Sequence, residues 1–176
     1  MSSKINVGYI IKQHFNTLRD ASSGKVSLMD VLVFIFLPVI FGGLVFIGQG
    51  LSKDIFSLSV NFGAISTALL MSVLVLVYDQ ESKINLSVKA QPDMVDHYEA
   101  KLSVLADLYQ NICYTIVASI CLVIFSVIGM AVFDECMGDM AHLIFSLSSA
   151  FVAFLFSNIV ITMLMVIKRF HALLTH

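Results

Sequence analysis

The chain has 176 residues, of which 59% are hydrophobic and 12% are charged, and its formal net charge is −2. This composition leaves little of the chain for a soluble domain, and the mean hydropathy of +0.94 is typical of a membrane protein. The ten basic residues are too few to predict direct nucleic-acid binding.

Four segments without Asp, Glu, Lys or Arg account for this composition. They are 22 to 28 residues long, and a helix needs roughly 20 apolar residues to cross the hydrocarbon core of a bilayer. The sequence therefore predicts an all-α, polytopic membrane protein with a single domain, residues 1–176. Its four transmembrane helices are expected at about residues 30–50, 55–78, 108–133 and 141–167.

The basic residues predict the orientation of these spans. If the odd-numbered spans run outward, nine basic residues lie on the inner side and only Lys53 lies outside. Because positive charge is retained on the cytoplasmic side, both termini are expected in the cytoplasm. The acidic loop 134–139 then lies outside.

Residues 1–26 form a basic and apolar segment ahead of the first span. Val7, Ile11, Phe15 and Leu18 share one face of a helix. Two interpretations are open: a helix in the inner membrane interface, or a helix packed on the cytoplasmic loop of this or a neighbouring subunit.

The first span contains Pro38, which is expected to kink it or to require a neighbouring group for the freed carbonyl. The glycines that follow, Gly42, Gly43, Gly48 and Gly50, predict a close helix contact, with a flexible gate as the alternative.

Polar residues recur at bilayer depth in the second and fourth spans. Ser57, Asn61 and Ser72 lie near one face of the second span, together with Ala64 and Ala68. The fourth span contributes Asn158 and Thr162. An amide in hydrocarbon needs partners, so these residues predict either hydrogen bonds between helices or the lining of a narrow pore in an oligomer.

The connection 79–107 predicts a cytoplasmic stalk that extends the second and third spans. Apolar residues from Val95 to Ile116 are spaced 3-4-3-4, and a matching row runs from Leu74 to Val88. We expect two helices that turn near Pro92 and pack on each other, or form a bundle between subunits. The charged surface of this stalk is the expected docking site for a cytoplasmic protein, through Asp93, Asp96, Glu99 and Lys101.

Motifs for catalysis or for cofactor binding are missing from the sequence. We find no nucleophile elbow, no phosphate-binding glycine loop and no paired intramembrane carboxylates, so an enzyme is not expected and no cofactor or metal site is predicted. The histidines are scattered. Cys136 is a candidate for an intersubunit disulfide only if it faces an oxidising compartment.

The layout resembles small four-span membrane proteins of bacterial anti-phage defence cassettes. It is similar to the membrane subunit of the Kiwa system in its basic amphipathic start, in the run from Ser27-Leu28-Met29-Asp30 to Phe36-Leu37-Pro38, and in the Val77-Tyr78-Asp79 end of the second span. The resemblance implies a bacterial inner-membrane location, homo-oligomerisation and a soluble cytoplasmic partner.

The stalk and the missing catalytic groups predict a non-enzymatic membrane subunit that senses a membrane event and scaffolds a cytoplasmic partner. The resemblance implies that this subunit is oligomeric, lies in the inner membrane and acts in bacterial anti-phage defence. The alternative is a small oligomeric ion channel or pore-forming effector, for which the serine and asparagine stripes are the evidence.

Overall fold

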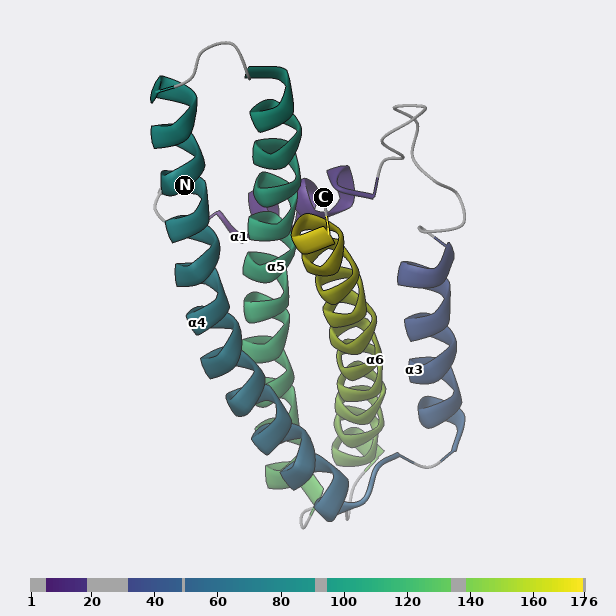
Figure 1. Cartoon of the computed structure of the whole chain (residues 1–176). Helices are drawn as coiled ribbons and strands as arrows, with labels where there is room; N and C mark the ends of the chain where they lie inside the picture. Colours follow the sequence, from purple (N-terminus) through teal and green to yellow (C-terminus); the bar gives the residue numbers. More distant parts are fainter. Residues whose placement is uncertain (1–5, 19–31, 49, 91–94, 134–138, 176) are drawn as a thin grey trace.

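The computed structural model describes residues 6–18, 32–48, 50–90, 95–133 and 139–175 (Figure 1). The side chains of residues 87–90, 95–97, 100, 139 and 172–175 are not described. Every regular element in these ranges is a helix, which confirms the predicted all-α class. The sequence features at Ser27–Asp30, Pro92, Asp93 and Cys136 lie outside the described residues.

Six helical elements follow one another along the chain. The three long helices account for most of the structure, and a π-helical turn, η1, leads directly into α3. The elements are α1 (Val7–Asn16), η1 (Leu32–Phe36), α3 (Leu37–Ile47), α4 (Lys53–Ala90), α5 (Val95–Phe133) and α6 (Asp139–Thr175).

The helices form a row in the order α4, α5, α6, α3 (Figure 1). α5 packs on both α4 and α6, while α3 packs on α6 and, within the described residues, does not contact α4. α1 lies on α5 at the end of the molecule where α4 and α5 approach their turn and where α6 ends. We call this the hairpin end and the opposite one the Lys53 end.

Three of the helices are long and apolar enough to cross a membrane. They contain the predicted spans 55–78, 108–133 and 141–167, within Lys53–Leu86, Lys101–Phe133 and Met140–His171. The apolar helix at the remaining predicted span covers only Leu32–Ile47. Its 16 residues measure about 24 Å, which is short of the roughly 30 Å of a hydrocarbon core.

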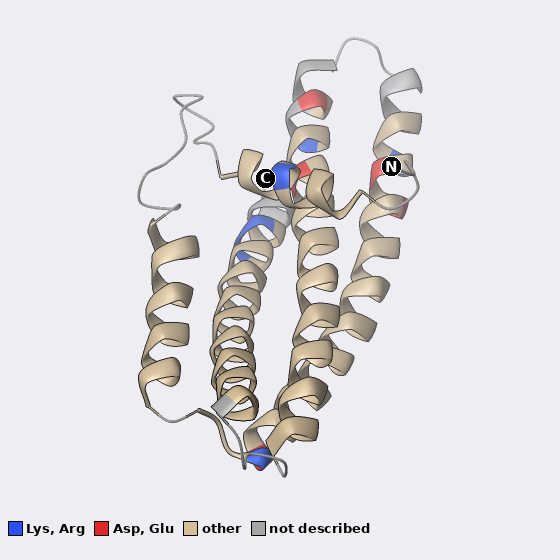
Figure 2. Cartoon of the chain, turned by 180° about the vertical axis from the view of Figure 1, so that it is seen from behind, with Lys and Arg blue, Asp and Glu red and all other residues tan. Residues whose placement is uncertain are grey.

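Charged residues lie at the two ends of the molecule and not between them (Figure 2). α4 has 38 residues and α5 has 39, so each is about 57 Å long, nearly twice the hydrocarbon thickness. Both helices therefore continue well past their uncharged segments at the hairpin end.

The two predicted apolar rows pack on each other within one chain. Val77 and Leu70 of α4 share a core with Leu105, Leu108 and Ile112 of α5. Tyr109, which the 3-4 spacing places in the row, is 39% exposed. The core is displaced toward Leu108 because α6 contributes Val166 and Phe170 to it, which a two-helix pattern does not anticipate.

Glycine permits the closest helix contacts. A Cβ at Gly42 of α3 would lie 2.9 Å from the carbonyl oxygen of Ala150 in α6, and one at Gly63 of α4 would lie 3.0 Å from the Ser119 carbonyl of α5. The predicted contact therefore exists at Gly42. It does not extend to Gly43, where a Cβ would meet nothing within 4 Å.

Candidate functional site at the hairpin end

α1 turns a polar face toward the span helices. His14 is 1% exposed and Thr17 is 6% exposed, with Leu18 buried beside them. Val7 and Ile11, which share the predicted apolar face, are exposed, whereas Leu18 of the same face is buried. The helix is thus rotated so that one flank holds the buried polar groups and the adjacent flank stays apolar and open.

Asn111 of α5 is the anchor for this polar face. Its Oδ1 atom lies 2.7 Å from His14 Nδ1 and 2.9 Å from the Thr17 hydroxyl, which is also 2.8 Å from the His14 carbonyl oxygen. With Oδ1 as the acceptor, His14 Nδ1 carries the proton. His14 Nε2 and Asn111 Nδ2 are then buried without a hydrogen-bond partner among the described residues.

Stacking extends the contact into the interior of the protein. The His14 ring lies parallel to the Tyr114 ring, with centroids 3.9 Å apart and an interplanar angle of 3°. The Tyr114 hydroxyl donates to Asn158 Oδ1 of α6 at 2.7 Å. Asn158 Nδ2 in turn donates to the Phe34 carbonyl oxygen at 3.1 Å, so α1 is connected to η1 through two intervening side chains.

The Phe34 carbonyl is the group that Pro38 deprives of its usual partner. In an α-helix it would accept the N–H of residue 38, which proline lacks. The structure has a π-helical turn here, and Asn158 supplies the side-chain donor. The predicted need for a neighbouring group at Pro38 and the predicted need of Asn158 for a partner are therefore met by one hydrogen bond.

Arg169 of α6, which is partly exposed, links the end of α1 to α5. Its Nη2 donates to the Thr17 carbonyl oxygen at 2.6 Å, and its Nη1 lies 3.1 Å from Asp107 Oδ2 of α5. A cation beside the last carbonyls of α1 is favoured by the helix dipole. We call the set His14, Thr17, Asn111, Tyr114, Asn158 and Arg169 the polar junction.

Burial controls the charge of His14. It lowers the pKa of the ring from 6.5 to about 4; the Asn111 hydrogen bond opposes this shift and the Arg169 charge reinforces it. His14 is therefore neutral at pH 7, as its single Nδ1 proton requires.

The predicted site residues divide between the interior and the surface. Asn158 and Thr162 are buried, and the Thr162 hydroxyl donates to the Asn158 carbonyl. Ser57, Asn61 and Ser72 are exposed on α4 and take no part in the polar junction. Among the docking residues, Glu99 is exposed and Lys101 half-buried, whereas for Asp96 only the backbone, within α5, is described.

Sequence reasoning missed most of the polar junction. Asn111 lies within an uncharged span and is as polar as Asn61 and Asn158, so its type and depth could have drawn attention to it. His14 gave no comparable signal, because a histidine on a short amphipathic helix is usually at the surface.

The arrangement holds α1 against α5 and α6 through hydrogen bonds of buried groups. Within the described residues, no cluster of His, Cys, Asp or Glu side chains could hold a metal ion. What the polar junction can do chemically is exchange protons at His14 and exchange hydrogen-bond partners if α1 moves.

No protein-family model matches the chain, and neither a curated protein nor a solved structure shows significant similarity to it.

Proposed function

We propose that this chain is an oligomeric membrane subunit, without enzymatic activity, that senses a change in the bilayer and relays it to a cytoplasmic partner. The observation that carries the proposal is the attachment of α1 to the span helices through buried polar groups, while Val7 and Ile11 beside them stay exposed. A helix held in this way can leave the bundle for the bilayer interface without first exposing an apolar core.

The proposed orientation places the hairpin end in the cytoplasm of a bacterium, with the chain in the inner membrane. Lys12, Lys83 and Arg169 are at this end, which fits the retention of positive charge inside. Both termini are then cytoplasmic, and η1 and α3 together belong to the first of four crossings.

The proposed relay runs from α1 to two other parts of the molecule. One path is His14–Tyr114–Asn158–Phe34, which reaches η1. The other is Thr17–Arg169–Asp107, which reaches the base of the α4–α5 hairpin. A displacement of α1 would break hydrogen bonds on both paths, and this gives the bilayer a mechanical connection to the cytoplasmic surface.

Movement of α1 tests the sensing proposal. Spin labels at Lys12→Cys and Glu99→Cys, in a chain whose native cysteines are replaced by serine, report the distance from α1 to the hairpin in proteoliposomes. We expect this distance to lengthen after osmotic downshift or after depolarisation by an ionophore. A distance that is the same before and after both treatments would refute it.

The proposed docking surface is the charged surface around the α4–α5 hairpin, with Asp93, Asp96, Glu99 and Lys101. Together with the resemblance to defence-cassette membrane proteins, it supports a soluble partner in an anti-phage system. Recovery of the partner from the native cell should fall when Asp93, Asp96 and Glu99 are changed to lysine. Equal recovery with a folded variant would remove this surface from the proposal.

A second candidate function, an oligomeric channel, is favoured by the exposure of Ser57, Asn61 and Ser72. An amide facing hydrocarbon costs several kcal/mol unless it is paired, so this face of α4 is the proposed contact with further copies. In planar bilayers a channel lined by this face should change its conductance in Asn61→Leu. Pure protein that conducts nothing, or an Asn61→Leu variant that conducts as before, would exclude this role.

A further inference from the structure

We propose that an apolar groove between α3 and α4 binds the hydrocarbon chains of a membrane lipid from the leaflet at the Lys53 end. The inference rests on the proposed membrane-sensing function and deepens it, because it names the bilayer component that contacts the sensor. Nothing in the polar junction is part of this groove.

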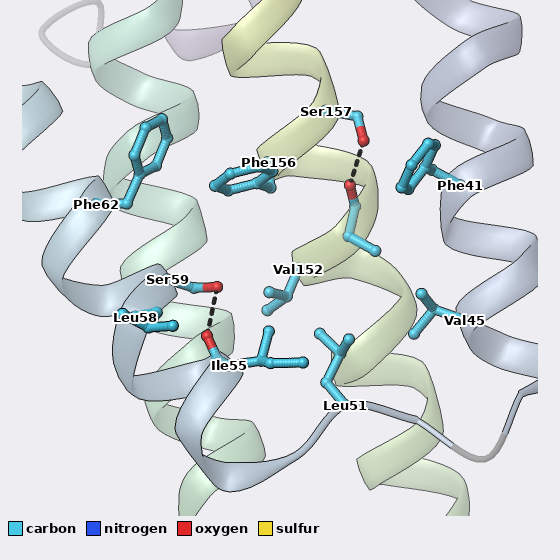
Figure 3. A pocket seen from close by; sticks show the side chains of 11 residues that line it. Phe41, Val45, Leu51, Ile55, Leu58, Ser59, Phe62, Val152, Phe156 and Ser157 are labelled. Atoms are coloured by element: carbon cyan, nitrogen blue, oxygen red, sulfur yellow. Dashed lines mark hydrogen bonds between the residues drawn. The ribbon is translucent and has the colours of Figure 1, made fainter.

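The groove lies where α3 packs on α6 and α4 packs chiefly on α5, so that α3 and α4 do not contact each other within the described residues. Its volume is about 440 Å³. Phe41 and Val45 form one wall, Ile55 and Phe62 form the other, and Val152 and Phe156 of α6 lie between them (Figure 3).

Both hydroxyl protons of the lining are already donated within the protein. The only polar side chains of the lining are Ser59 and Ser157. The Ser59 hydroxyl donates to the Ile55 carbonyl at 2.8 Å and that of Ser157 to the Ala153 carbonyl at 2.9 Å, both within their own helices (Figure 3). A groove whose hydroxyls are already bonded is suited to hydrocarbon and not to a polar molecule.

The groove lies at the depth of a single leaflet. Lys53 and Asp54 are the last charges of α4 at this end, and Ile55 follows them directly. Ile55 and Phe62 are seven positions apart, which is about 10 Å along the helix and within the roughly 15 Å of one leaflet's hydrocarbon layer. A lipid with its headgroup near Lys53 would place its acyl chains in the groove.

At the depth of one leaflet the groove faces lipid hydrocarbon, which a second copy of the chain would have to displace. A dimer that carries no lipid in the mass spectrum would therefore overturn the proposal.

Native mass spectrometry of the full chain tests the proposal. The protein is reconstituted in nanodiscs of palmitoyl-oleoyl phosphatidylglycerol, transferred to detergent and weighed. We expect about one retained lipid per wild-type chain and a roughly tenfold lower retained fraction in Ser59→Leu/Ser157→Leu, which fills the groove. Ser59→Ala/Ser157→Ala should retain the lipid, because the serine hydroxyls do not contact it.

The matched control for added bulk is Gly43→Leu. Gly43 is on α3 with open space around its Cβ position and does not line the groove, so this variant should retain lipid like the wild type. The proposal is overturned if the wild-type chain carries no lipid, if the leucine pair retains it, or if Gly43→Leu loses it equally. The helical signal in circular dichroism verifies that each variant is folded. The spin-label distance from α1 to the hairpin, measured in the same variants, reports separately on the proposed function.

Discussion

In the polar junction, side chains of α1, α5 and α6 meet through hydrogen bonds of 2.6 to 2.9 Å, whereas in the groove nearer the Lys53 end α3 and α4 face each other across apolar walls. Directional bonds in a low-dielectric interior favour one arrangement and penalise others, because each displaced group loses its partner. Apolar walls impose no such direction. The polar junction therefore favours one arrangement of its helices, whereas the groove tolerates several. Both regions include residues of α6.

The largest effect that would break this comparison is expected for Asn158→Leu. The change removes a donor from the Phe34 carbonyl and an acceptor from the Tyr114 hydroxyl, and unsatisfied buried groups cost about 1–3 kcal/mol each. We predict a loss of about 2–4 kcal/mol in the free energy of unfolding in detergent.

Thr162→Val is the matched control for Asn158→Leu. The Thr162 hydroxyl is equally buried but bonds only a carbonyl of its own helix, so its loss should cost less than about 1 kcal/mol. If both variants lose the same stability, the bridge from Asn158 to Phe34 does not contribute as described.

The next effect is the pH dependence of α1 docking. Because burial lowers the pKa of docked His14 to about 4, an undocked ring with a pKa near 6.5 takes up its proton first as pH falls. Docking should be at full strength above pH 6.5 and should weaken from pH 6.5 to about 4, by up to about 3 kcal/mol. The spin-label distance from α1 to the hairpin measures it.

His14→Phe sharpens the pH prediction. Phenylalanine preserves a ring against Tyr114 but cannot be protonated, so α1 should be bound less tightly and its docking should no longer depend on pH between 4 and 6.5. Persistence of the full wild-type pH response in this variant would assign the response to another group.

A smaller effect is expected for Asp107→Asn. The Arg169–Asp107 pair is partly exposed, with 21% and 45% of the side chains accessible, and such pairs contribute below about 1 kcal/mol. Thermal unfolding should shift little and the shift should diminish further in high salt. A loss as large as that of Asn158→Leu would make the ion pair the main connection to the hairpin.

The smallest effect is predicted in the groove, for Ser59→Ala. Its hydroxyl bonds only the Ile55 carbonyl, so the free energy of unfolding should change by less than about 1 kcal/mol. The same measurement for Asn158→Leu provides the scale. A loss of unfolding free energy at Ser59 as large as that of Asn158→Leu would mean that polar contacts stabilise the groove and the polar junction equally.

Much of the fold was predictable because membrane helices are specified by long uncharged runs, and three of them appear where expected. Local chemistry also predicted that the Pro38 region and Asn158 each need partners. Their pairing with each other could not be predicted, since it depends on how α3 packs along α6. Similarly, the 3.6-residue period identifies α1 as amphipathic but favours its apolar face as the buried one. The structure buries His14 and Thr17 instead because Asn111 of α5 supplies their partner.

The most direct test of the account is hydrogen exchange of the full chain in nanodiscs, comparing wild type with Asn111→Leu. The variant removes the shared acceptor of His14 and Thr17, and the account predicts faster exchange both in α1 and in η1. α1 reaches η1 through Tyr114 and Asn158 and through the edge contact of the His14 and Phe34 rings, whose centroids are 6.0 Å apart. Faster exchange in α1 with unchanged protection in η1 would contradict the coupling of α1 to the span helices.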